Sequence, residues 1–123
     1  TMVNDSVAVT LEAPASVKAG APVAFRVALA NPTSRPVMLY LLGREVTFDI
    51  TVSGPGGAEV WRRLEDSPFQ EILAVRTLAP RERIVLEAEW PGGRQVGNYT
   101  ATAKVLTDGI PLQSSPIRFE IRP

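Results

Sequence analysis

The chain has 123 residues, which suits one domain with a core of its own. Lys and Arg together number 13, as do Asp and Glu, and the formal net charge of zero provides no basic surface for nucleic acid or anionic lipid. The absence of histidine and cysteine excludes a Ser-His-Asp triad, thiol catalysis, disulfides and the common zinc sites, so we expect no enzyme activity, no metal and no cofactor.

The dominant pattern along the chain is an alternation of apolar and polar residues. A period of two is typical of strands with one face on a core and one face in water. In residues 47–52, for example, Phe48 and Val52 are expected to face the core and Asp49 to face the solvent. The same alternation predicts strands at 7–11, 23–29, 47–52, 83–90, 99–105 and 117–121.

Two stretches break this alternation. Residues 37–43 are apolar on both faces, so this strand is expected either to be covered twice or to leave an apolar patch outside. Val60 and Trp61 are adjacent, so one should enter the core while the other lies at an edge, at a bulge or under a loop. The outer face of 38–42 is one surface that either residue could cover. We expect Trp61 to be mainly a packing residue.

Clusters of glycine, proline, asparagine and aspartate separate the predicted strands, as they do in turns. Residues 62–75 are nearest to a helical pattern, but Pro68 interrupts them and no helix is expected. About nine short strands in residues 1–123 predict a single all-β domain, an immunoglobulin-like antiparallel β-sandwich, with an up-and-down barrel as the alternative. Tyr99 begins a strand just after Gly97, so its hydroxyl is expected to bond an upstream backbone group in a tyrosine corner.

Several short motifs follow one another in a recognisable order. They are GREVTFDITV (43–52), GGAEVWR (56–62), Phe69, LAPRE (78–82), Trp90 and GNY (97–99). This order, over roughly residues 20–106, resembles the bacterial intracellular proteinase inhibitor family, the BsuPI domain. The family is similar in its Phe-Asp strand, its Gly-x-x-Val-Trp-Arg strand, its loop phenylalanine and its Gly-x-Tyr. This chain departs from the family at Arg81, where the family turn usually has glycine.

The resemblance implies an immunoglobulin-like fold and inhibition of a serine protease of the subtilisin type. It also implies a cytoplasmic protein, whereas the lack of cysteine fits a bacterial exported domain equally well. The alternative function is a structural or adhesive domain of a larger exported or cell-envelope protein, without a protease target. In that case the edge strands and the 38–42 patch would be interdomain contacts.

Two exposed connections are the main candidates for binding a protein partner. Residues 62–71 would enter a protease cleft as an extended segment, because such clefts bind backbone in β fashion and one side chain fills a specificity pocket. Leu64 or Phe69 would be that side chain, and Pro68 would stiffen the segment. The alternative is a solvated crossover in which Phe69 packs on the core and the charges form weak ion pairs.

In the second connection, 107–115, the apolar residues Ile110 and Leu112 lie on either side of Pro111. No apolar run approaches the ~20 residues that cross a bilayer, so we expect a protein partner and no membrane span. The partner-binding candidates in both connections are Arg62, Arg63, Leu64, Glu65, Asp66, Pro68, Phe69, Ile110 and Leu112.

Overall fold

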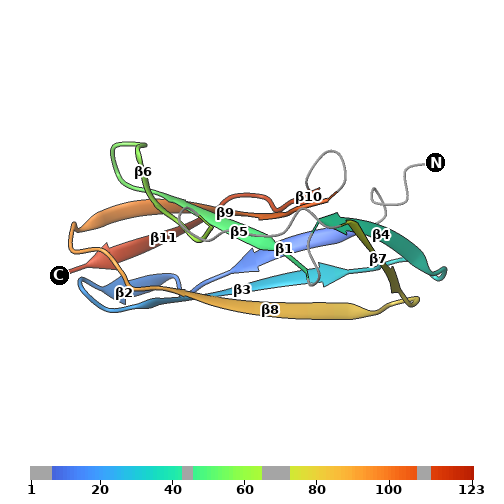
Figure 1. Ribbon diagram of the computed structural model, residues 1–123. Helices are drawn as coiled ribbons and strands as arrows, with labels where there is room; N and C mark the ends of the chain where they lie inside the picture. Colours follow the sequence, from blue (N-terminus) through green and yellow to red (C-terminus); the bar gives the residue numbers. More distant parts are fainter. Residues whose placement is uncertain (1–6, 43–45, 65–72, 108–111) are drawn as a thin grey trace.

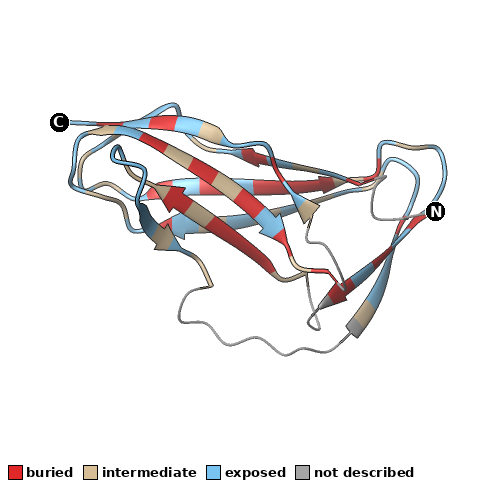
Figure 2. Ribbon diagram, turned by 90° about the horizontal axis from the view of Figure 1, so that it is seen from above, coloured by how far each residue is buried: buried red, intermediate tan, exposed pale blue. Residues whose placement is uncertain are grey.

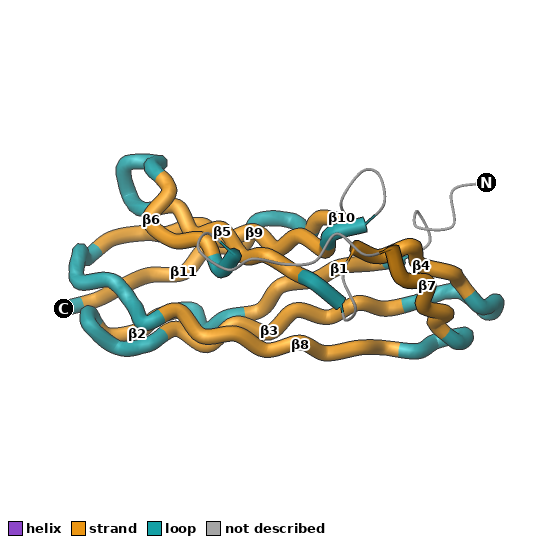
Figure 3. The backbone as a smooth tube through the Cα atoms, viewed as in Figure 1, coloured by secondary structure: helices purple, strands orange, loops and turns teal. Residues whose placement is uncertain are grey.

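The computed structural model describes residues 7–42, 46–64, 73–107 and 112–123. Within these ranges the chain forms eleven strands and no helix, hence no helix long and apolar enough to cross a membrane (Figure 3). The all-β prediction is confirmed, although the described residues hold eleven strands rather than about nine. The strands are β1 (Ala8–Glu12), β2 (Ser16–Lys18), β3 (Val23–Ala30), β4 (Val37–Leu42), β5 (Phe48–Ser53), β6 (Glu59–Arg62), β7 (Leu73–Leu78), β8 (Arg83–Trp90), β9 (Gly97–Val105), β10 (Leu112–Gln113) and β11 (Ile117–Arg122).

Most of the strands form two layers, which lie one above the other in Figure 1. The smaller layer is the sheet β1-β3-β8, and the larger layer is the sheet β2-β11-β9-β5-β6, in which β10 also pairs with β9. Strands β4 and β7 form a separate two-stranded sheet, the β4–β7 ribbon, at the end away from the C terminus. Because neither layer closes on itself, the molecule is a sandwich and the barrel alternative is wrong.

The alternation read from the sequence is confirmed for the strands that face the core. Figure 2 shows that buried and more exposed residues alternate along these strands, as expected when one face of each strand meets the other layer. This burial joins the two layers into one apolar core. Its members include Val23, Phe25, Val27 and Leu29 on β3, Phe48, Ile50 and Val52 on β5, Tyr99, Ala101, Ala103 and Val105 on β9, and Phe119 and Ile121 on β11.

An aromatic cluster occupies one part of this core. Trp61 of β6 stacks on Phe25 of β3, with ring centroids 6.1 Å apart, and on Trp90 of β8 at 6.3 Å. Tyr99 and Phe119, from the larger layer, stack on each other at 5.6 Å, and both contact Trp90. Such ring pairs contribute about 0.5–1.5 kcal/mol each beyond the area they bury. Trp61 is therefore a packing residue, as expected, and it ties the edge strand β6 to the opposite layer.

The β4–β7 ribbon shows what happens to the strand that is apolar on both faces. Its outer face leaves Met38 41% and Tyr40 37% exposed, and Val75, which pairs with Tyr40, 54% exposed. The strand therefore leaves an apolar patch outside, the second of the two expectations. The expectation that Val60 or Trp61 covers this face is wrong, because Trp61 lies in the core and Val60 is exposed.

Three strands were not indicated by the alternation. With three and two residues, β2 and β10 are too short to show a period. In β7, Arg76 stands opposite Leu39 of β4, on the side that faces the core, and reaches Glu82 at 4.0 Å. Because the charged Arg76 lies on the same face as the apolar partner Leu39, residues 73–78 do not show the alternation of apolar and polar residues. Their pairing with β4 is what defines the strand.

Tyr99 forms the predicted tyrosine corner. Its hydroxyl donates a hydrogen bond to the backbone carbonyl of Gln95 at 2.6 Å. This bond holds the connection between β8 and β9 against the start of β9, where the chain passes from the smaller layer to the larger one.

The turn between β7 and β8 contains the departure from the family motif. Arg81 has a φ of 65°, in the left-handed region that favours glycine. The turn is closed around it, since the Glu82 carboxylate accepts a hydrogen bond from the backbone nitrogen of Ala79 at 2.8 Å. The Arg81 guanidinium donates to the carbonyl of Pro32, in the neighbouring turn. A non-glycine residue is thus held in a conformation that costs about 1–2 kcal/mol.

Candidate partner-binding site

The β5–β6 hairpin positions the first candidate segment. Its turn at 53–57 has Gly57 at a φ of 87°, a conformation that glycine adopts readily. Val52 of β5 pairs with Trp61 of β6, which is the outermost strand of its sheet. Trp61 points into the sandwich, and Val60, its neighbour in the chain, is 46% exposed at the edge. This agrees with the expectation for an adjacent apolar pair on an edge strand.

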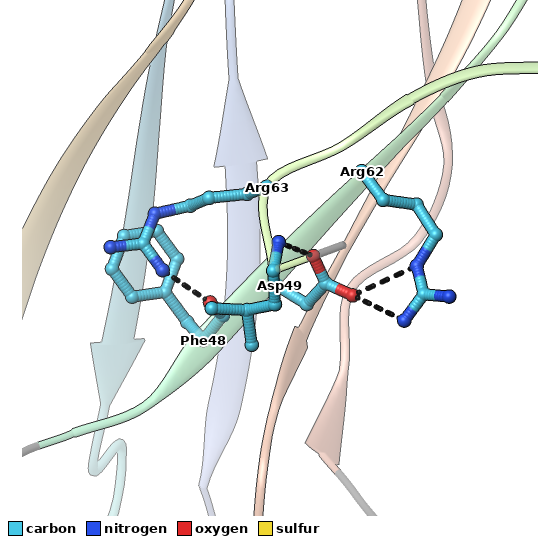
Figure 4. Close-up of polar contacts among 5 residues, drawn as sticks. Phe48, Asp49, Arg62 and Arg63 are labelled. Carbon is cyan, nitrogen blue, oxygen red and sulfur yellow. Dashed lines mark hydrogen bonds and ion pairs between the residues drawn. The ribbon is translucent and has the colours of Figure 1, made fainter. Parts of the chain in front are cut away.

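A buried carboxylate lies beside the end of β6 (Figure 4). Asp49 of β5 is only 6% exposed. Its Oδ1 accepts a hydrogen bond from the backbone nitrogen of Leu64 at 3.0 Å, and its Oδ2 lies 3.3 Å from Nη2 and 3.4 Å from Nε of Arg62. The expectation that Asp49 faces the solvent is wrong, because Arg62 and Leu64 fold over its carboxylate.

Arg63 holds β5 through different contacts from those of Arg62. Its Nη1 donates to the carbonyl of Phe48 at 2.7 Å, and its guanidinium carbon lies 3.8 Å from the centroid of the Phe48 ring. Its backbone nitrogen donates to the carbonyl of Ile50 at 3.0 Å. Burial lowers the pKa of the Arg63 guanidinium below its ordinary value, and the Asp49 carboxylate partly offsets this by raising it. Arg63 nevertheless stays charged at neutral pH, as arginine does in proteins.

The backbone hydrogen bond to Asp49 contributes more to fixing the chain than the Arg62 ion pair does. The Arg62 side chain is 45% exposed, and exposed ion pairs are worth about 0–1 kcal/mol. A hydrogen bond from an N–H to a buried carboxylate is worth about 1.5–3 kcal/mol. The segment after β6 is therefore anchored at Leu64, where it leaves the sheet.

The two candidate segments begin from the same end of the larger layer. Phe48 of β5 pairs with Val105 of β9, and Val105 pairs on its other side with Leu112 of β10. The backbone nitrogen of Leu106 donates to the carbonyl of Thr47 at 2.9 Å at this end. Neighbouring strands lie about 4.8 Å apart, so Leu112 is about 10 Å from β5 and about 14 Å from the chain beyond β6. We call this the loop end, and its residues are Thr47, Leu64, Leu106 and Leu112.

The structure describes four of the nine candidate residues. It brings Arg62, Arg63 and Leu64 together against β5, where all three contact Phe48, Asp49 or both. Leu112 is half-buried on β10, on the far side of β9 from β5. The remaining candidates lie outside the described residues: Glu65, Asp66, Pro68, Phe69 and Ile110.

Sequence reasoning did not identify Asp49 as part of this site. Its place in an alternating strand predicts solvent exposure, and the residues that cover it come more than ten positions later in the chain. One signal could have revealed it, since the Phe48-Asp49 pair belongs to the motif order on which the family resemblance rests.

A family model described as the BsuPI intracellular proteinase inhibitor matches residues 9–110. The chain belongs to this family. The match includes the whole β5–β6 hairpin and the Asp49 contacts. BsuPI members are inhibitors and not catalysts, which confirms the expectation that the chain is not an enzyme. A search of curated proteins finds no match.

Solved structures resemble the fold at low sequence identity. A CARDB domain from Pyrococcus furiosus is 16% identical with a TM-score of 0.51, covering 94% of this chain and 84% of that one. The C-terminal domain of wzt is 8% identical with a TM-score of 0.55, covering 96% and 74%. The DNA glycosylase AlkC from Pseudomonas fluorescens is 16% identical with a TM-score of 0.52, and this BsuPI chain spans only 31% of its length. These likenesses concern the sandwich fold alone.

Proposed function

We propose that this BsuPI chain blocks a serine protease of the subtilisin type and that the loop end of its larger layer is the contact surface. Membership of an inhibitor family supports inhibition of a proteinase in general. The observation that carries the choice of surface is that both candidate segments leave the same end of the larger layer, one of them directly after an anchored residue.

Anchoring matters because an inhibitory segment must be ordered when it binds. Ordering a free loop costs about 0.5–1.5 kcal/mol for each side chain that is immobilised, which subtracts from affinity. At Leu64 the backbone is already bonded to the buried Asp49, and Arg63 is bonded to Phe48. Part of the ordering cost has therefore been met within the fold before a partner arrives.

The spacing of the loop end also suits one partner. A standard interface buries about 800 Å² on each side and involves about 20–30 residues of each protein. Two segments that start about 14 Å apart fit within such an area. Residues 62–69 would supply the main contact, with Leu64 or Phe69 in the specificity pocket, and residues around Ile110 and Leu112 would add a second contact.

The proposal is tested by assaying the purified chain against a panel of serine proteases that includes subtilisin-type enzymes. We expect sub-micromolar inhibition of at least one subtilisin-type protease. Phe69→Asp and Ile110→Asp should each weaken inhibition without lowering the melting temperature. Val75→Asp, a matched change on the β4–β7 ribbon, should leave inhibition unchanged.

Three results would count against the proposal in different ways. Absence of inhibition by the folded chain across the whole panel would overturn the activity. Full inhibition by both Phe69→Asp and Ile110→Asp would overturn the contact surface alone. Loss of folding in Phe69→Asp would identify Phe69 as a core residue, as in the solvated-crossover alternative, and leave Leu64 as the residue for the specificity pocket.

The exposed patch on the β4–β7 ribbon favours a second candidate function. Met38, Tyr40 and Val75 form an outer face of the kind that contacts another domain or protein. In a structural or adhesive domain, this face would bind a neighbouring component and no protease would be inhibited. Tyr40→Ser would then abolish binding to the component that co-purifies from the source cells, and Phe69→Asp would not.

A further inference from the structure

Strand β8 is the outermost strand of the smaller layer, and one of its edges is open. All eight of its residues pair with β3 on one side, and no strand in the described part of the chain pairs with it on the other. Its inward residues Ile84 and Leu86 are only partly buried, whereas Leu29 and Val27, their partners on β3, are completely buried. The open edge therefore leaves apolar surface uncovered at the rim of the core.

The register shows which backbone groups point to this edge. The backbone nitrogen of Asn31 donates to the carbonyl of Glu82 at 2.9 Å, and this pair directly continues the β3–β8 register. Hydrogen-bonded pairs alternate along an antiparallel ladder, so the even-numbered residues of β8 bond to β3. The odd-numbered residues direct their N–H and C=O groups to the open edge: Arg83, Val85, Glu87 and Glu89.

The outer face of this edge is complementary to itself. Val85 is 45% exposed, and it stands between Arg83, two residues earlier, and Glu87, two residues later. If an identical strand runs antiparallel with Val85 opposite Val85, each Arg83 stands opposite a Glu87 and each Ile84 opposite a Leu86. Opposite charges and apolar pairs across a sheet are stabilising, about 0.2–1 kcal/mol each.

Neighbouring registers lack this match. Moving the second strand by two positions, so that Leu86 becomes the central residue, places Glu89 opposite Arg83 but sets the apolar Val85 opposite the charged Glu87. Moving it by four positions, so that Glu87 becomes the central residue, places two glutamates directly opposite each other, which is destabilising. Moving it by one position brings edge-facing groups opposite groups that already bond to β3, so the ladder cannot form. Among these registers, the one centred on Val85 sets Val85 opposite Val85, Ile84 opposite Leu86 and Arg83 opposite Glu87, so that apolar residues meet apolar residues and opposite charges meet each other.

We propose that two copies of this chain associate through β8, antiparallel, with Val85 on the two-fold axis. The two smaller layers would become one continuous sheet, and each odd-numbered pair between Arg83 and Glu87 would exchange two backbone hydrogen bonds. Glu87 already lies 3.6 Å from Arg26, but both side chains are more than half exposed. That pair is therefore worth about 1 kcal/mol at most and leaves Glu87 able to meet a second arginine.

This dimer is independent of the proposed inhibition. Strand β8 belongs to the smaller layer, while the loop end is built from β5, β6, β9 and β10 of the larger layer. The two proposals therefore fail separately, one in a protease assay and the other in a measurement of mass.

Sedimentation velocity over a concentration series tests the association, both in the original chain and in variants whose charges on β8 are reversed. The chain should sediment as a dimer that dissociates on dilution. Arg83→Glu and Glu87→Arg each oppose like charges at two symmetric positions, so each should weaken association about tenfold. The double variant restores opposite charges and should return to within about threefold of the original affinity. Glu12→Arg, on the other edge of the same layer, is the matched control and should leave the dimer intact.

A cross-link tests the register directly. The chain has no cysteine, so Val85→Cys introduces a single thiol. Residues that pair through hydrogen bonds in an antiparallel sheet have Cα atoms about 5.5 Å apart, which suits a disulfide. Mild oxidation should therefore convert Val85→Cys to a covalent dimer, while Val60→Cys, equally exposed on the edge strand β6, should stay monomeric. A monomer at every concentration, equal cross-linking of both thiols, or a dimer indifferent to Arg83→Glu would overturn the proposal.

Discussion

The β5–β6 corner and the β4–β7 ribbon are both strand pairs at the margin of the sandwich, and they use their apolar side chains in opposite ways. At the corner, Trp61 enters the core and stacks on aromatic rings from the smaller layer. On the ribbon, Met38 and Tyr40 face outward and are exposed. The corner is part of the folded core, while the outer face of the ribbon contributes little to it.

This difference shows which contacts hold an edge strand to the rest of the sandwich. Strand β6 is held by its partner β5, by the opposite layer through Trp61, and by the buried carboxylate of Asp49. On the outer face of the ribbon, Met38 pairs with Thr77 and Tyr40 with Val75, and all four residues are exposed. Changes at the corner should therefore alter stability, and changes on the outer face of the ribbon should alter only what the surface can contact.

The largest expected effect is at Trp61. Trp61→Ala should lower the free energy of unfolding by about 3 kcal/mol, because it removes a ring packed between both layers. Val60→Ala, one residue earlier, should cost less than about 0.5 kcal/mol, because that side chain is at the surface. Urea unfolding of the two variants measures the difference, and equal effects would contradict the inward position of Trp61.

A smaller effect is expected at Asp49. Asp49→Ala should cost about 2 kcal/mol, because it leaves the half-buried backbone N–H of Leu64 without its acceptor. Arg62→Ala should cost about 1 kcal/mol or less, because its side chain is half exposed and its ion pair is weak. The comparison is made by chemical denaturation. If Arg62→Ala proved the more damaging change, the ion pair and not the backbone bond would anchor the segment.

The turn that joins the ribbon to β8 tests the strain of a left-handed backbone conformation. Arg81→Gly should be more stable than Arg81→Ala by about 1 kcal/mol, because only glycine adopts this left-handed conformation without strain. Both changes remove the guanidinium contact to Pro32, so their difference isolates the backbone term. Thermal unfolding of the two variants gives the value, and a more stable alanine variant would contradict the φ of this residue.

The smallest effect is expected on the outer face of the ribbon. Tyr40→Ser and Met38→Ser should each change the free energy of unfolding by less than about 0.5 kcal/mol, as is usual for exposed positions. Calorimetry of the two variants tests this. A loss of 2 kcal/mol or more from either would mean that the face is covered within the folded chain.

Much of the fold can be predicted from local pattern, because alternation reports which side of a strand meets the core. This is sufficient for β3, β5 and β9, for the inward position of Trp61 and for the tyrosine corner at Tyr99. Pattern fails where a distant segment decides the environment. Arg76 obscures β7, whose extended conformation comes from pairing with β4, and no local signal tells that the connection after β8 crosses to the other layer.

The candidate site divides in the same way. The sequence indicates the segments 62–71 and 107–115 as separate connections. That they leave one end of the sheet depends on the pairing of Phe48 with Val105, which joins strands far apart in the chain, together with the pairing of Val105 with Leu112. The burial of Asp49 is likewise non-local. Residue type suggests where a partner could bind, and strand register determines which of these places lie together.

The parallel pairing of β2 with β11 has a consequence for how the molecule assembles. Residues 16–18 lie beside residues 120–122, and β11 fills the place between β2 and β9. Strand β11 follows all the other described strands in the chain and is nevertheless an interior strand of its sheet, so this layer stays incomplete until residues 117–122 have been synthesised. Contacts between such remote residues slow folding, because the long loop must close before any of them forms. Removing residues 117–122 should accordingly release β2 as well and leave a chain that collapses without reaching the native sheet.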